Sequence, residues 1–243
     1  MRTVVVFSGA GLSAESGIPT FRDSDGLWEN HKIEDVASPE GWDRDPELVL
    51  QFYEQRFHGI KQAEPNIAHR AIAKLEEKFK VINITQNIDD LLERAGCTNV
   101  EHVHGCINQM KCERHYNITN LDGDTNYQCS YLATQAKPVV MGDSCPVCGC
   151  QLRPHVVWFG EAVDLGYDKI ADLVREVKYN DGVFICVGTS AEVAPASLLI
   201  PFFSQVQNKY IVNLKTWPIS DYELREGPAS EQLPKLVEEL LDE

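Results

Sequence analysis

Two glycines stand one residue apart directly after the first apolar run of the chain. The run Val4–Phe7 is predicted to be a buried strand, and Gly9-Ala10-Gly11-Leu12-Ser13 follows it. A tight turn without side chains near its backbone, leading into a helix, can hold a pyrophosphate against free N–H groups. Taken alone, the pattern is also open to a structural turn that binds no ligand.

The sequence after this turn differs from that of the dinucleotide-binding dehydrogenases. A dehydrogenase would continue with a second strand that ends in Asp or Glu about 20 residues later. Residues 25–31 read as a loop instead. We therefore predict a dinucleotide site that departs from the dehydrogenase pattern.

Polar side chains also follow two further predicted strands. Thr85-Gln86-Asn87-Ile88-Asp89 begins where the run Val81–Thr85 ends, and His104 ends the run Val100–His104. In open α/β sheets, ligands bind at the carboxyl ends of the strands. A histidine in that position can act as a general base near neutral pH. The alternative is a histidine that only satisfies a hydrogen bond in the core.

Six of the eight cysteines are concentrated between residues 106 and 150. In a reducing compartment such a cluster indicates metal or redox chemistry sooner than disulfides. Cys145-x-x-Cys148, followed by Gly149, has the spacing of half a zinc knuckle. A redox pair usually opens a helix after a strand, whereas this pair lies among turn-forming residues. Cys97 and Cys186 are predicted to be buried and without a chemical role.

Short apolar strands alternate with helical patterns along most of the chain. The predicted strands are Val4–Phe7, Val81–Thr85, Val100–His104, Val183–Gly188 and Tyr210–Leu214. The predicted helices are Pro46–Ile60, Ala68–Lys78, Ile88–Ala95, Asp168–Val177 and, after Pro234, Lys235–Leu241. Most of the strands lack polar alternation, as expected of strands that are covered on both faces. The pattern predicts an α/β fold with a doubly wound, Rossmann-like parallel sheet.

The stretch Lys111–Cys150 interrupts this alternation, because it is rich in Cys, Asn, Asp, Gly and Pro. We interpret it as part of a small inserted module. The predicted division is a large dinucleotide-binding domain of residues 1–105 and 151–243, and a small zinc-binding module of residues 106–150.

The formal net charge of −15 argues against a surface for nucleic acid or anionic membrane. No apolar run approaches the roughly 18 residues of a membrane-spanning helix. The first strand begins at Val4, which leaves no room for a targeting segment. We therefore expect a cytoplasmic protein that binds neither nucleic acid nor membrane.

The longer segment Gly9–Arg22 closely resembles the first signature of the sirtuin family, Gly-Ala-Gly-x-Ser-x-x-Ser-Gly-Ile-Pro-x-Phe-Arg. Further matches follow in the family's order, namely Thr85–Asp89, His104-Gly105, Leu152–Glu161, Gly188-Thr189-Ser190, Asn213 and Gly227–Ser230. The resemblance covers essentially the whole chain. Six ordered motifs are too many to arise by chance.

The resemblance implies an NAD-dependent enzyme that removes acyl groups from the lysine side chains of proteins. Its products would be free lysine, nicotinamide and O-acyl-ADP-ribose. By the same resemblance, His104 activates a ribose hydroxyl, and Asn87 and Asp89 hold the carboxamide end of NAD. The other residues implied in the NAD site are Gly9, Ala10, Gly11, Ser13, Ile18, Phe21, Arg22, Trp28, Gln86, Ile88, Gly188, Thr189, Ser190, Asn213 and Ala229.

The segment Val157–Glu161 is implied to bind the acylated peptide. Its residues Val157, Phe159, Gly160 and Glu161 would pair their backbone with the peptide, which adds a strand between the two domains. The structural alternative for this segment is an apolar core strand.

Sirtuins hold a structural zinc ion with four cysteines at this place in the chain, but the first pair here reads Cys112-x-x-His115. The implied ligands are Cys112, Cys145, Cys148 and either His115, which occupies the knuckle position, or Cys129. A site that no longer binds zinc is the third possibility.

Tyr53 and Arg56 lie three residues apart in the predicted helix 46–60 and therefore share a face. A solvated surface arginine is the commoner reading of such a pair. The sirtuin subgroup that removes succinyl, malonyl or glutaryl groups carries Tyr-x-x-Arg in this helix, where both side chains bind the acyl carboxylate. The resemblance therefore predicts a desuccinylase and demalonylase that also removes acetyl groups.

Two other functions are compatible with the same residues. An NAD glycohydrolase or ADP-ribosyltransferase would use the same site but would release free ADP-ribose or transfer it. A non-catalytic NAD-sensing module would turn over no acylated peptide. The motif context of His104 argues against the second of these.

Overall fold

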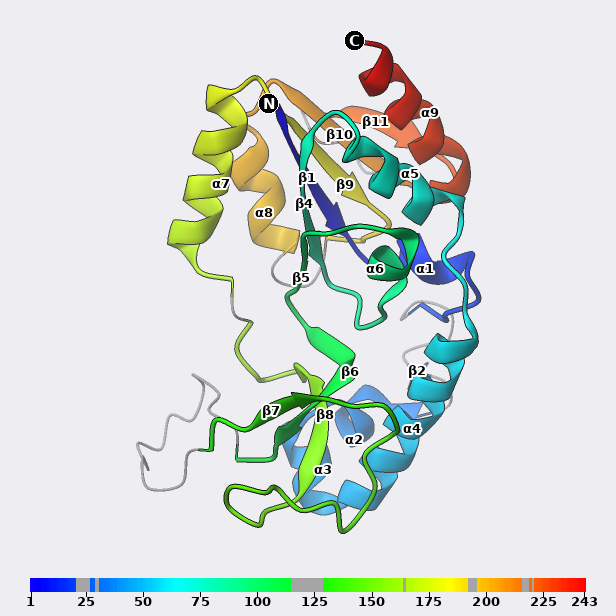
Figure 1. Ribbon diagram of the computed structural model, residues 1–243, viewed down its shortest axis with the longest axis vertical. Helices are drawn as coiled ribbons and strands as arrows, with labels where there is room; N and C mark the ends of the chain where they lie inside the picture. Colours follow the sequence, from blue (N-terminus) through cyan, green and yellow to red (C-terminus); the bar gives the residue numbers. More distant parts are fainter. Residues whose placement is uncertain are drawn as a thin grey trace.

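The computed structural model describes residues 1–20, 27–28, 31–114, 129–163, 165–191, 196–215, 219 and 221–243. Within these ranges the chain forms two parts, which are stacked along the longest axis of the molecule (Figure 1). The upper part in this view contains a six-stranded sheet, and the lower part contains a three-stranded sheet with helices α2 (Ile33–Val36), α3 (Pro39–Arg44) and α4 (Pro46–Gln62) beside it. Both chain termini lie at the upper end, so the lower part is inserted between segments of the upper one.

All six strands of the large sheet run parallel, in the order β11-β10-β9-β1-β4-β5. They are β1 (Thr3–Ser8), β4 (Lys80–Thr85), β5 (Val100–His102), β9 (Val183–Val187), β10 (Asn208–Asn213) and β11 (Glu223–Glu226). Numbered by their place in the chain, they stand in the order 3-2-1-4-5-6, which is that of dinucleotide-binding sheets. The predicted doubly wound sheet is confirmed. The sequence missed β11, because its Glu-Leu-Arg-Glu run lacks the apolar character of a covered strand.

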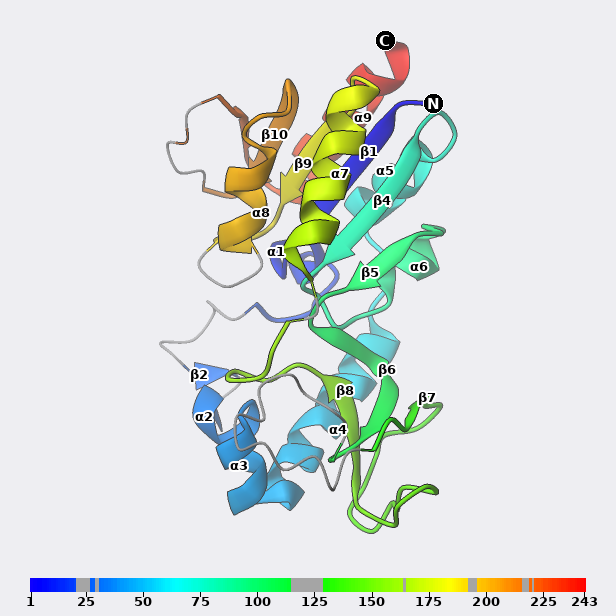
Figure 2. The same ribbon diagram turned by 90° about the vertical axis from the view of Figure 1, so that its left-hand side faces the viewer.

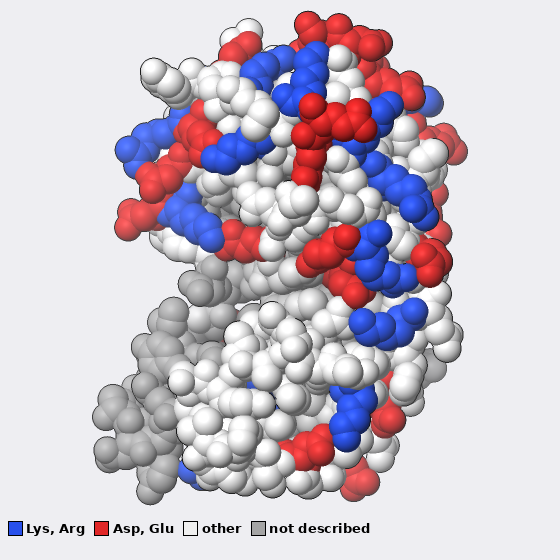
Figure 3. Space-filling view, in the orientation of Figure 1, with Lys and Arg blue, Asp and Glu red and all other residues white. Residues whose placement is uncertain are grey.

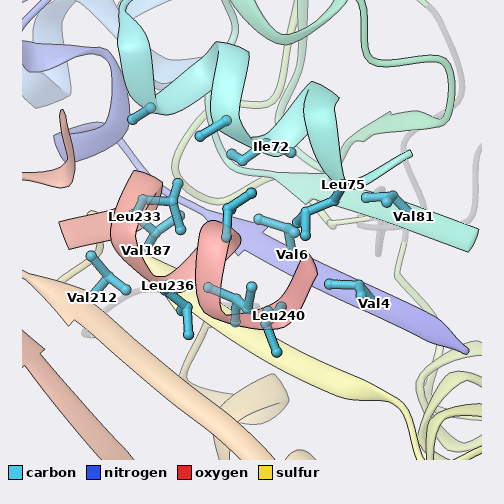
Figure 4. Packing of buried hydrophobic residues seen from close by; sticks show 14 of the residues in the cluster. Val4, Val6, Ile72, Leu75, Val81, Val187, Val212, Leu233, Leu236 and Leu240 are labelled. Carbon is cyan, nitrogen blue, oxygen red and sulfur yellow. The ribbon is translucent and has the colours of Figure 1, made fainter. Parts of the chain in front are cut away.

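Alternate residues of β1 belong to two different hydrophobic cores. Val4 and Val6 pack with Ile72 of α5 (Ile67–Leu75) and Leu236 of α9 (Ala229–Asp242). Figure 4 shows these side chains meeting between the sheet and the two helices. α1 (Gly11–Ala14) and α6 (Leu91–Ala95) border the same core. This face of the sheet is therefore covered by α1, α5, α6 and α9.

The opposite face of the sheet forms the second core. Val5 and Phe7 of β1 pack there with α7 (Tyr167–Tyr179) and α8 (Ala196–Phe203). The rings of Phe184 and Phe203 stack with their centroids 4.1 Å apart. Figure 2 shows α7 and α8 together on their own side of the strands. Both faces are covered, which explains why the strands read as continuous apolar runs.

The lower part is built from two separate stretches of the chain. α2 (Ile33–Val36), α3 (Pro39–Arg44) and α4 (Pro46–Gln62) share a core with the antiparallel strands β6 (Gly105–Cys112) and β8 (Leu152–Val156). β7 (Leu132–Thr134) pairs with the other edge of β6, and β2 (Leu27–Trp28) pairs with β3 (His31–Lys32). The division at residues 105 and 151 stays a prediction. Because one core joins these helices to the strands, we propose that the smaller unit includes α2–α4 as well.

The last helix begins earlier than the sequence predicted. α9 starts at Ala229 and contains Pro234, whereas the prediction was a helix from Lys235 to Leu241. Ala229 is buried, and the carboxylate of Glu15 accepts hydrogen bonds from the backbone N–H and the hydroxyl of Ser230. These contacts stabilise the additional residues, although a proline inside a helix removes one backbone hydrogen bond.

Charged side chains of both signs are interspersed on the upper part in Figure 3, while the lower part of this face is largely uncharged. Among the described residues of this face, Lys and Arg side chains are therefore interrupted by acidic ones. Among the described residues, no helix combines the length and the apolar character that crossing a membrane would take.

We expect Leu233→Ala to lower the free energy of unfolding by about 2–5 kcal/mol, because truncating a buried leucine leaves a cavity. Leu233 is fully buried in the core beneath α9, in the part of the helix that the sequence missed. The matched control is Leu224→Ala in β11, where the leucine is 39% exposed and the expected loss is under about 1 kcal/mol. Urea denaturation measures both values. An equal loss in the two variants would contradict the assignment of Leu233 to the core.

Candidate active site

The candidate site lies where the strand order of the sheet reverses, between β1 and β9. The N–H of Gly9 donates to Val187 O (3.0 Å), and the N–H of Gly11 donates to Gly188 O (2.8 Å). Gly188 has a φ of +64°, and a Cβ at this position would stand 2.4 Å from the backbone nitrogen of Leu12. The backbone of the turn after β1 therefore lies in direct contact with the backbone of the turn after β9. The crevice outside these strand ends is where open α/β sheets bind ligands.

The glycine-rich turn does not offer the row of free N–H groups that the sequence predicted. α1 has only four residues, and the N–H groups of Leu12 and Ser13 donate to Gly9 O and Ala10 O. Together with the bonds of Gly9 and Gly11, four N–H groups of the turn are used inside the protein. The prediction was wrong for these four donors. What the turn offers a pyrophosphate is a backbone that can be approached closely.

A row of polar contacts joins three strand ends. Asn213 Nδ2, at the end of β10, donates to Thr189 O (2.8 Å), and Thr189 Oγ1 donates to Gln86 Oε1 (3.0 Å). Ser190 follows Thr189 directly, and Ala229 opens α9, which packs on α1. The structure thus brings these predicted residues to one edge of the sheet.

Ser13 connects the glycine-rich turn to Asn87 and Asp89. Its hydroxyl donates to Asp89 Oδ2 (2.9 Å) and accepts from Asn87 Nδ2 (3.1 Å). His69 Nε2 lies 3.4 Å from the same oxygen, and His69 Nδ1 accepts the N–H of Asn66, so the hydrogen of the ring is on Nε2. Burial lowers the pKa of His69 to about 4 and keeps the ring neutral. One donated and two accepted bonds use the full capacity of the hydroxyl, which fixes the orientation of both partners.

Asp89 is a buried carboxyl group whose ionisation depends on its neighbours. The residue is 6% exposed, and this burial raises its pKa. The N–H of Leu91 (3.1 Å), the hydroxyl of Ser13 and the charge of His102 act in the opposite direction. These groups favour the ionised carboxylate and so oppose the effect of burial.

His104 lies in the turn between β5 and β6, two residues past the end of the strand that was predicted to include it. Its Nδ1 lies 3.1 Å from Gln86 O. A carbonyl oxygen only accepts, so Nδ1 carries the hydrogen and Nε2 is the basic nitrogen of the neutral ring. Gly105 shapes the turn with a φ of +78°, where a Cβ would stand 2.1 Å from His155 O. A ring held in this tautomer can take a proton, as a general base must.

The segment Val157–Glu161 is a turn that contacts both parts of the molecule. The N–H of Val157 donates to His104 O (2.9 Å), and the N–H of Phe159 donates to Ala37 O (3.0 Å). Phe159 is 45% exposed, and Gly160 beside it is exposed as well. Because these N–H groups are used inside the protein, a peptide strand added here would pair with carbonyl groups of the segment.

The side chain of Glu161 is buried and paired. It is 3% exposed, and its carboxylate contacts Arg153 and accepts the N–H of Trp158 (3.0 Å). Lys111 Nζ lies 3.7 Å from the same carboxylate, and burial with the nearby charge of Arg153 lowers the pKa of Lys111 to about 8. Glu161 thus holds the shape of the segment. Neither Arg153 nor Lys111 could be recognised from the sequence, because no pattern marks a buried charge.

Tyr53 and Arg56 lie on the buried face of α4. Tyr53 is 1% exposed, and its hydroxyl accepts a hydrogen bond from Trp158 Nε1 (3.1 Å). Arg56 is 9% exposed, its guanidinium lies 4.2 Å from the ring centroid of Phe52, and burial lowers its pKa to about 10. Arg56 is therefore not a solvated surface residue. It carries its charge at neutral pH in a poorly hydrated place, where an anion is a favourable neighbour.

Four cysteines bring their sulfur atoms together in the lower part. The Sγ atoms of Cys112, Cys129, Cys145 and Cys148 all lie within 4.8 Å of one another. The Cys112–Cys148 and Cys129–Cys145 pairs are 3.4 Å and 3.6 Å apart. Tetrahedral zinc with Zn–S bonds of about 2.3 Å places its sulfur ligands roughly 3.8 Å apart, so this set fits zinc.

Of the two predicted candidates for the fourth ligand, Cys129 belongs to this cluster, and His115 lies outside the described residues. Phe21 and Arg22 also lie outside them. Trp28 belongs to β2, where it pairs with His31. Of the remaining predicted residues, Ile18 and Ile88 border the core of the lower part.

Sequence reasoning missed His69 and Asn66, which orient Ser13 and its turn. Asn66 caps α5 by accepting the N–H groups of Ala68 and His69, and its Nδ2 donates to Leu12 O (2.8 Å). The Asn-x-x-His spacing could have marked the start of α5. Nothing in that spacing indicates the contact with Ser13.

Comparison with known proteins agrees with this site. Residues 9–195 match the model of the Sir2 family. The NAD-dependent protein deacylase of Escherichia coli K12 is 43% identical over 248 residues, which cover 98% of this chain and 82% of that protein. The NAD-dependent protein deacylase of Pyrococcus furiosus is also 43% identical, over 244 residues that cover 97% of this chain and 92% of that protein.

Solved structures share the whole fold. An ADP-ribose complex of a Sir2 homologue mutant superposes with a TM-score of 0.81 at 38% identity, covering 99% of this chain and 92% of that one. A Sir2 homologue bound to NAD gives 0.79 at 38% identity, with 99% and 90% covered. A Sir2 complex with a p53 peptide and NAD gives 0.71 at 28% identity, with 99% and 92% covered. Because the family match runs from the glycine-rich turn past Ser190, and the likeness in fold spans nearly the whole chain, this protein belongs to the Sir2 family.

Proposed function

We infer that the chain is an NAD-dependent protein deacylase that acts on acylated lysine side chains of proteins. Relatives at 43% identity are named for this activity, and similar structures hold ADP-ribose or NAD. The observation that carries the inference is the double contact of Gln86. Its carbonyl holds the base His104, and its side chain holds Thr189 beside the crevice of the sheet. A general base thus stands at the edge where a dinucleotide would bind.

The residues of the site would have three roles: holding the carboxamide end of NAD, accepting a proton and holding the adenosine half. Bound NAD would supply the ADP-ribose that accepts the acyl group and the nicotinamide that leaves. Asn87 and Asp89, oriented by Ser13, would hold the carboxamide end, and His104 Nε2 would accept the proton of a ribose hydroxyl. The adenosine half would lie along Gly188, Thr189, Ser190, Asn213 and Ala229.

The acylated peptide would lie along Val157–Glu161, since this segment contacts His104 through its backbone. Incubation with NAD and an acylated peptide tests the activity. Formation of O-acyl-ADP-ribose supports a deacylase, whereas free ADP-ribose alone would support a glycohydrolase. We further propose a cytoplasmic location.

We expect His104→Ala to lower the turnover of acylated peptide by about 10²–10⁴-fold, because losing a general base typically costs this much. NAD should still bind, since the crevice at Gly9 and Gly188 is unchanged. Peptide turnover by mass spectrometry and NAD affinity by calorimetry measure the two effects. His58→Ala removes an exposed histidine of α4 and serves as the control. A His104→Ala variant with more than half of the original turnover would show that another group is the base.

We also propose that the enzyme prefers succinyl- or malonyl-lysine to acetyl-lysine. The support is the buried guanidinium of Arg56, three residues from Tyr53, whose hydroxyl contacts Trp158 of the proposed peptide segment. An acyl carboxylate could accept two N–H bonds from the guanidinium and an O–H bond from the phenol. An acetyl group offers neither charge nor acceptor at that position.

For this proposal, Arg56→Met is expected to lower the ratio of succinyl to acetyl turnover by about 10- to 100-fold, since a hydrogen bond to a charged group contributes roughly 1.5–3 kcal/mol. The ratio cancels any general loss of stability. Arg175→Met, at an exposed position of α7, is the control and leaves the ratio unchanged. If Arg56→Met lowers both activities by the same factor, Arg56 is structural and the acidic-acyl preference fails.

We propose that Cys112, Cys129, Cys145 and Cys148 hold one structural zinc ion. Four protein ligands close the coordination shell, so the metal would support the fold and take no part in the chemistry. His115 stays the alternative to Cys129 as the fourth ligand.

Elemental analysis of the protein purified without chelators should give about one zinc ion per chain. Cys129→Ser should lose it, because a tetrahedral site without one thiolate binds far more weakly. The control is Cys150→Ser, whose cysteine stands next to the knuckle but outside the four-sulfur cluster. Zinc retained in Cys129→Ser and lost in His115→Ala would assign the fourth ligand to His115. Absence of zinc from the unaltered protein would refute the site.

A further inference from the structure

His102, at the end of β5, contacts two hydrogen-bond acceptors with its two ring nitrogens. Nδ1 lies 2.8 Å from the backbone oxygen of Asn87, and Nε2 lies 2.8 Å from Glu93 Oε1 on α6. A carbonyl oxygen and an ionised carboxylate can only accept hydrogen bonds. Both nitrogens must therefore carry a hydrogen, and the ring is then an imidazolium ion. With 11% of its side chain exposed, this cation is largely shielded from water.

We propose that His102 is a positioning residue that carries a fixed positive charge beneath the Asn87–Asp89 segment, where it orients Asn87 and keeps Asp89 ionised. The inference deepens the proposed function, because it assumes that this segment holds the carboxamide end of NAD. His102 itself lies behind the segment and would act on NAD only through Asn87 and Asp89.

The first effect of His102 is mechanical, because it helps to fix the orientation of Asn87. The Asn87 side chain donates to Ser13, its N–H donates to Thr85 Oγ1 (3.1 Å), and its carbonyl accepts from His102. Three anchors on one residue leave its backbone and side chain a single orientation. Only the anchor to His102 involves a charge, and charge-assisted hydrogen bonds are about twice as strong as neutral ones.

The second effect of His102 is electrostatic, because its charge acts on the carboxyl group of Asp89. Asp89 lies in a buried place that raises its pKa, and the positive charge of His102 is one of the groups that oppose this shift. In return, Glu93 and the carbonyl of Asn87 raise the pKa of His102 above its usual value, against the effect of burial, and Asp89 adds to this. The two groups thus stabilise each other's charge.

The other charged groups nearby are already paired. Asp90 is within 3.4 Å of Lys61 and 3.7 Å of Arg94, and Asn108 donates to it. Glu101, which precedes His102 on β5, forms an ion pair with Lys169 of α7.

Further titratable neighbours in the described part of the chain are His69 and Cys106. His69 contacts the Ser13 hydroxyl and is kept neutral by burial. Cys106 lies near Asp89, Asp90 and Glu93. Burial raises its pKa to about 11, so the thiol is neutral near pH 7. Among the described residues, the positive charge that acts on Asp89 therefore comes from His102.

The expected pH dependence follows from the directions of these shifts. The two acceptors at its ring nitrogens hold His102 in the charged form, and its raised pKa means that this charge is lost at a higher pH than in an ordinary histidine. Removing the charge raises the pKa of Asp89 further, so that its carboxylate becomes protonated at a higher pH. A residue that served only the packing of β5 would change neither titration.

Nuclear magnetic resonance of the full chain, labelled with ¹⁵N-histidine and ¹³C-aspartate, tests both effects without substrate. We expect both ring nitrogens of His102 to be protonated at pH 7, with a titration midpoint above the usual value of about 6.5. In His102→Gln, which keeps a polar side chain but has no charge, the carboxyl resonance of Asp89 should titrate at a higher pH. In Glu93→Gln, the midpoint of His102 should fall.

Calorimetry with NAD completes the experiment. His102→Gln should weaken NAD binding by about tenfold or more at pH 7, the loss expected from one hydrogen bond to a charged group. In Glu93→Gln, the NAD affinity should fall at a lower pH than in the unaltered chain, because the charge of His102 is lost earlier. His58→Gln, at an exposed histidine whose Nε2 lies 3.9 Å from Glu54, is the matched control and should behave like the unaltered chain.

Two results would overturn the proposal: a His102 ring that is neutral at pH 7, or an Asp89 titration and NAD affinity that are unchanged in His102→Gln. Failure of the proposed function is a separate outcome. A chain that binds NAD but turns over no acylated peptide would leave these titrations and affinities as expected.

Discussion

The backbone contact between the Gly9–Gly11 turn and Gly188 is the constraint on which the rest of the site depends. Two hydrogen bonds of 2.8–3.0 Å join these connections, and no side chain can stand between them. The contact joins the two halves of the sheet, which meet between β1 and β9, at the carboxyl ends of these strands. It also places Ser13, two residues past Gly11, within reach of the next strand end. From there a single hydroxyl fixes both Asn87 and Asp89.

Buried charge is the second feature that shapes the molecule. Arg153, Lys111 and Glu161 meet out of contact with water, although removing such groups from water costs several kcal/mol each. That cost is offset only if every member is paired, so the arrangement tolerates little variation in the positions of β6 and β8. Because β8 is held in this way, the position of the segment that follows it is fixed as well. Its turn at Trp158 is held by Glu161, and its first residue, Val157, donates to the carbonyl of His104.

The parts of the structure that depend on local pattern could be predicted from the sequence. Continuous apolar runs such as Val4–Phe7 revealed the covered strands, and the position of His104 after such a run placed it at the ligand edge. The charged edge strand β11 could not be found in this way, because only its pairing with β10 makes it a strand. The residues His69, Arg153 and His102 also escaped, since their roles follow from burial and from partners distant in sequence. No spacing in the chain indicates that a histidine 0% exposed will lie beside Ser13.

One strand connects the cysteine cluster to the proposed general base. β6 begins at Gly105, which forms the turn of His104, and ends at Cys112, one of the four clustered cysteines. Its eight residues span roughly 23 Å at about 3.3 Å per residue, so a metal ion at Cys112 is too distant to touch the reacting groups. It can still influence them, because β6 is paired with β8 at both ends and is bonded to Ile88 through Ile107. Fixing the far end of a paired strand restricts how its near end can move, and the near end carries both the turn of His104 and the support of the Asn87–Asp89 segment. The cysteine cluster and the site thus form one mechanical unit, although no side chain of the cluster takes part in the proposed chemistry.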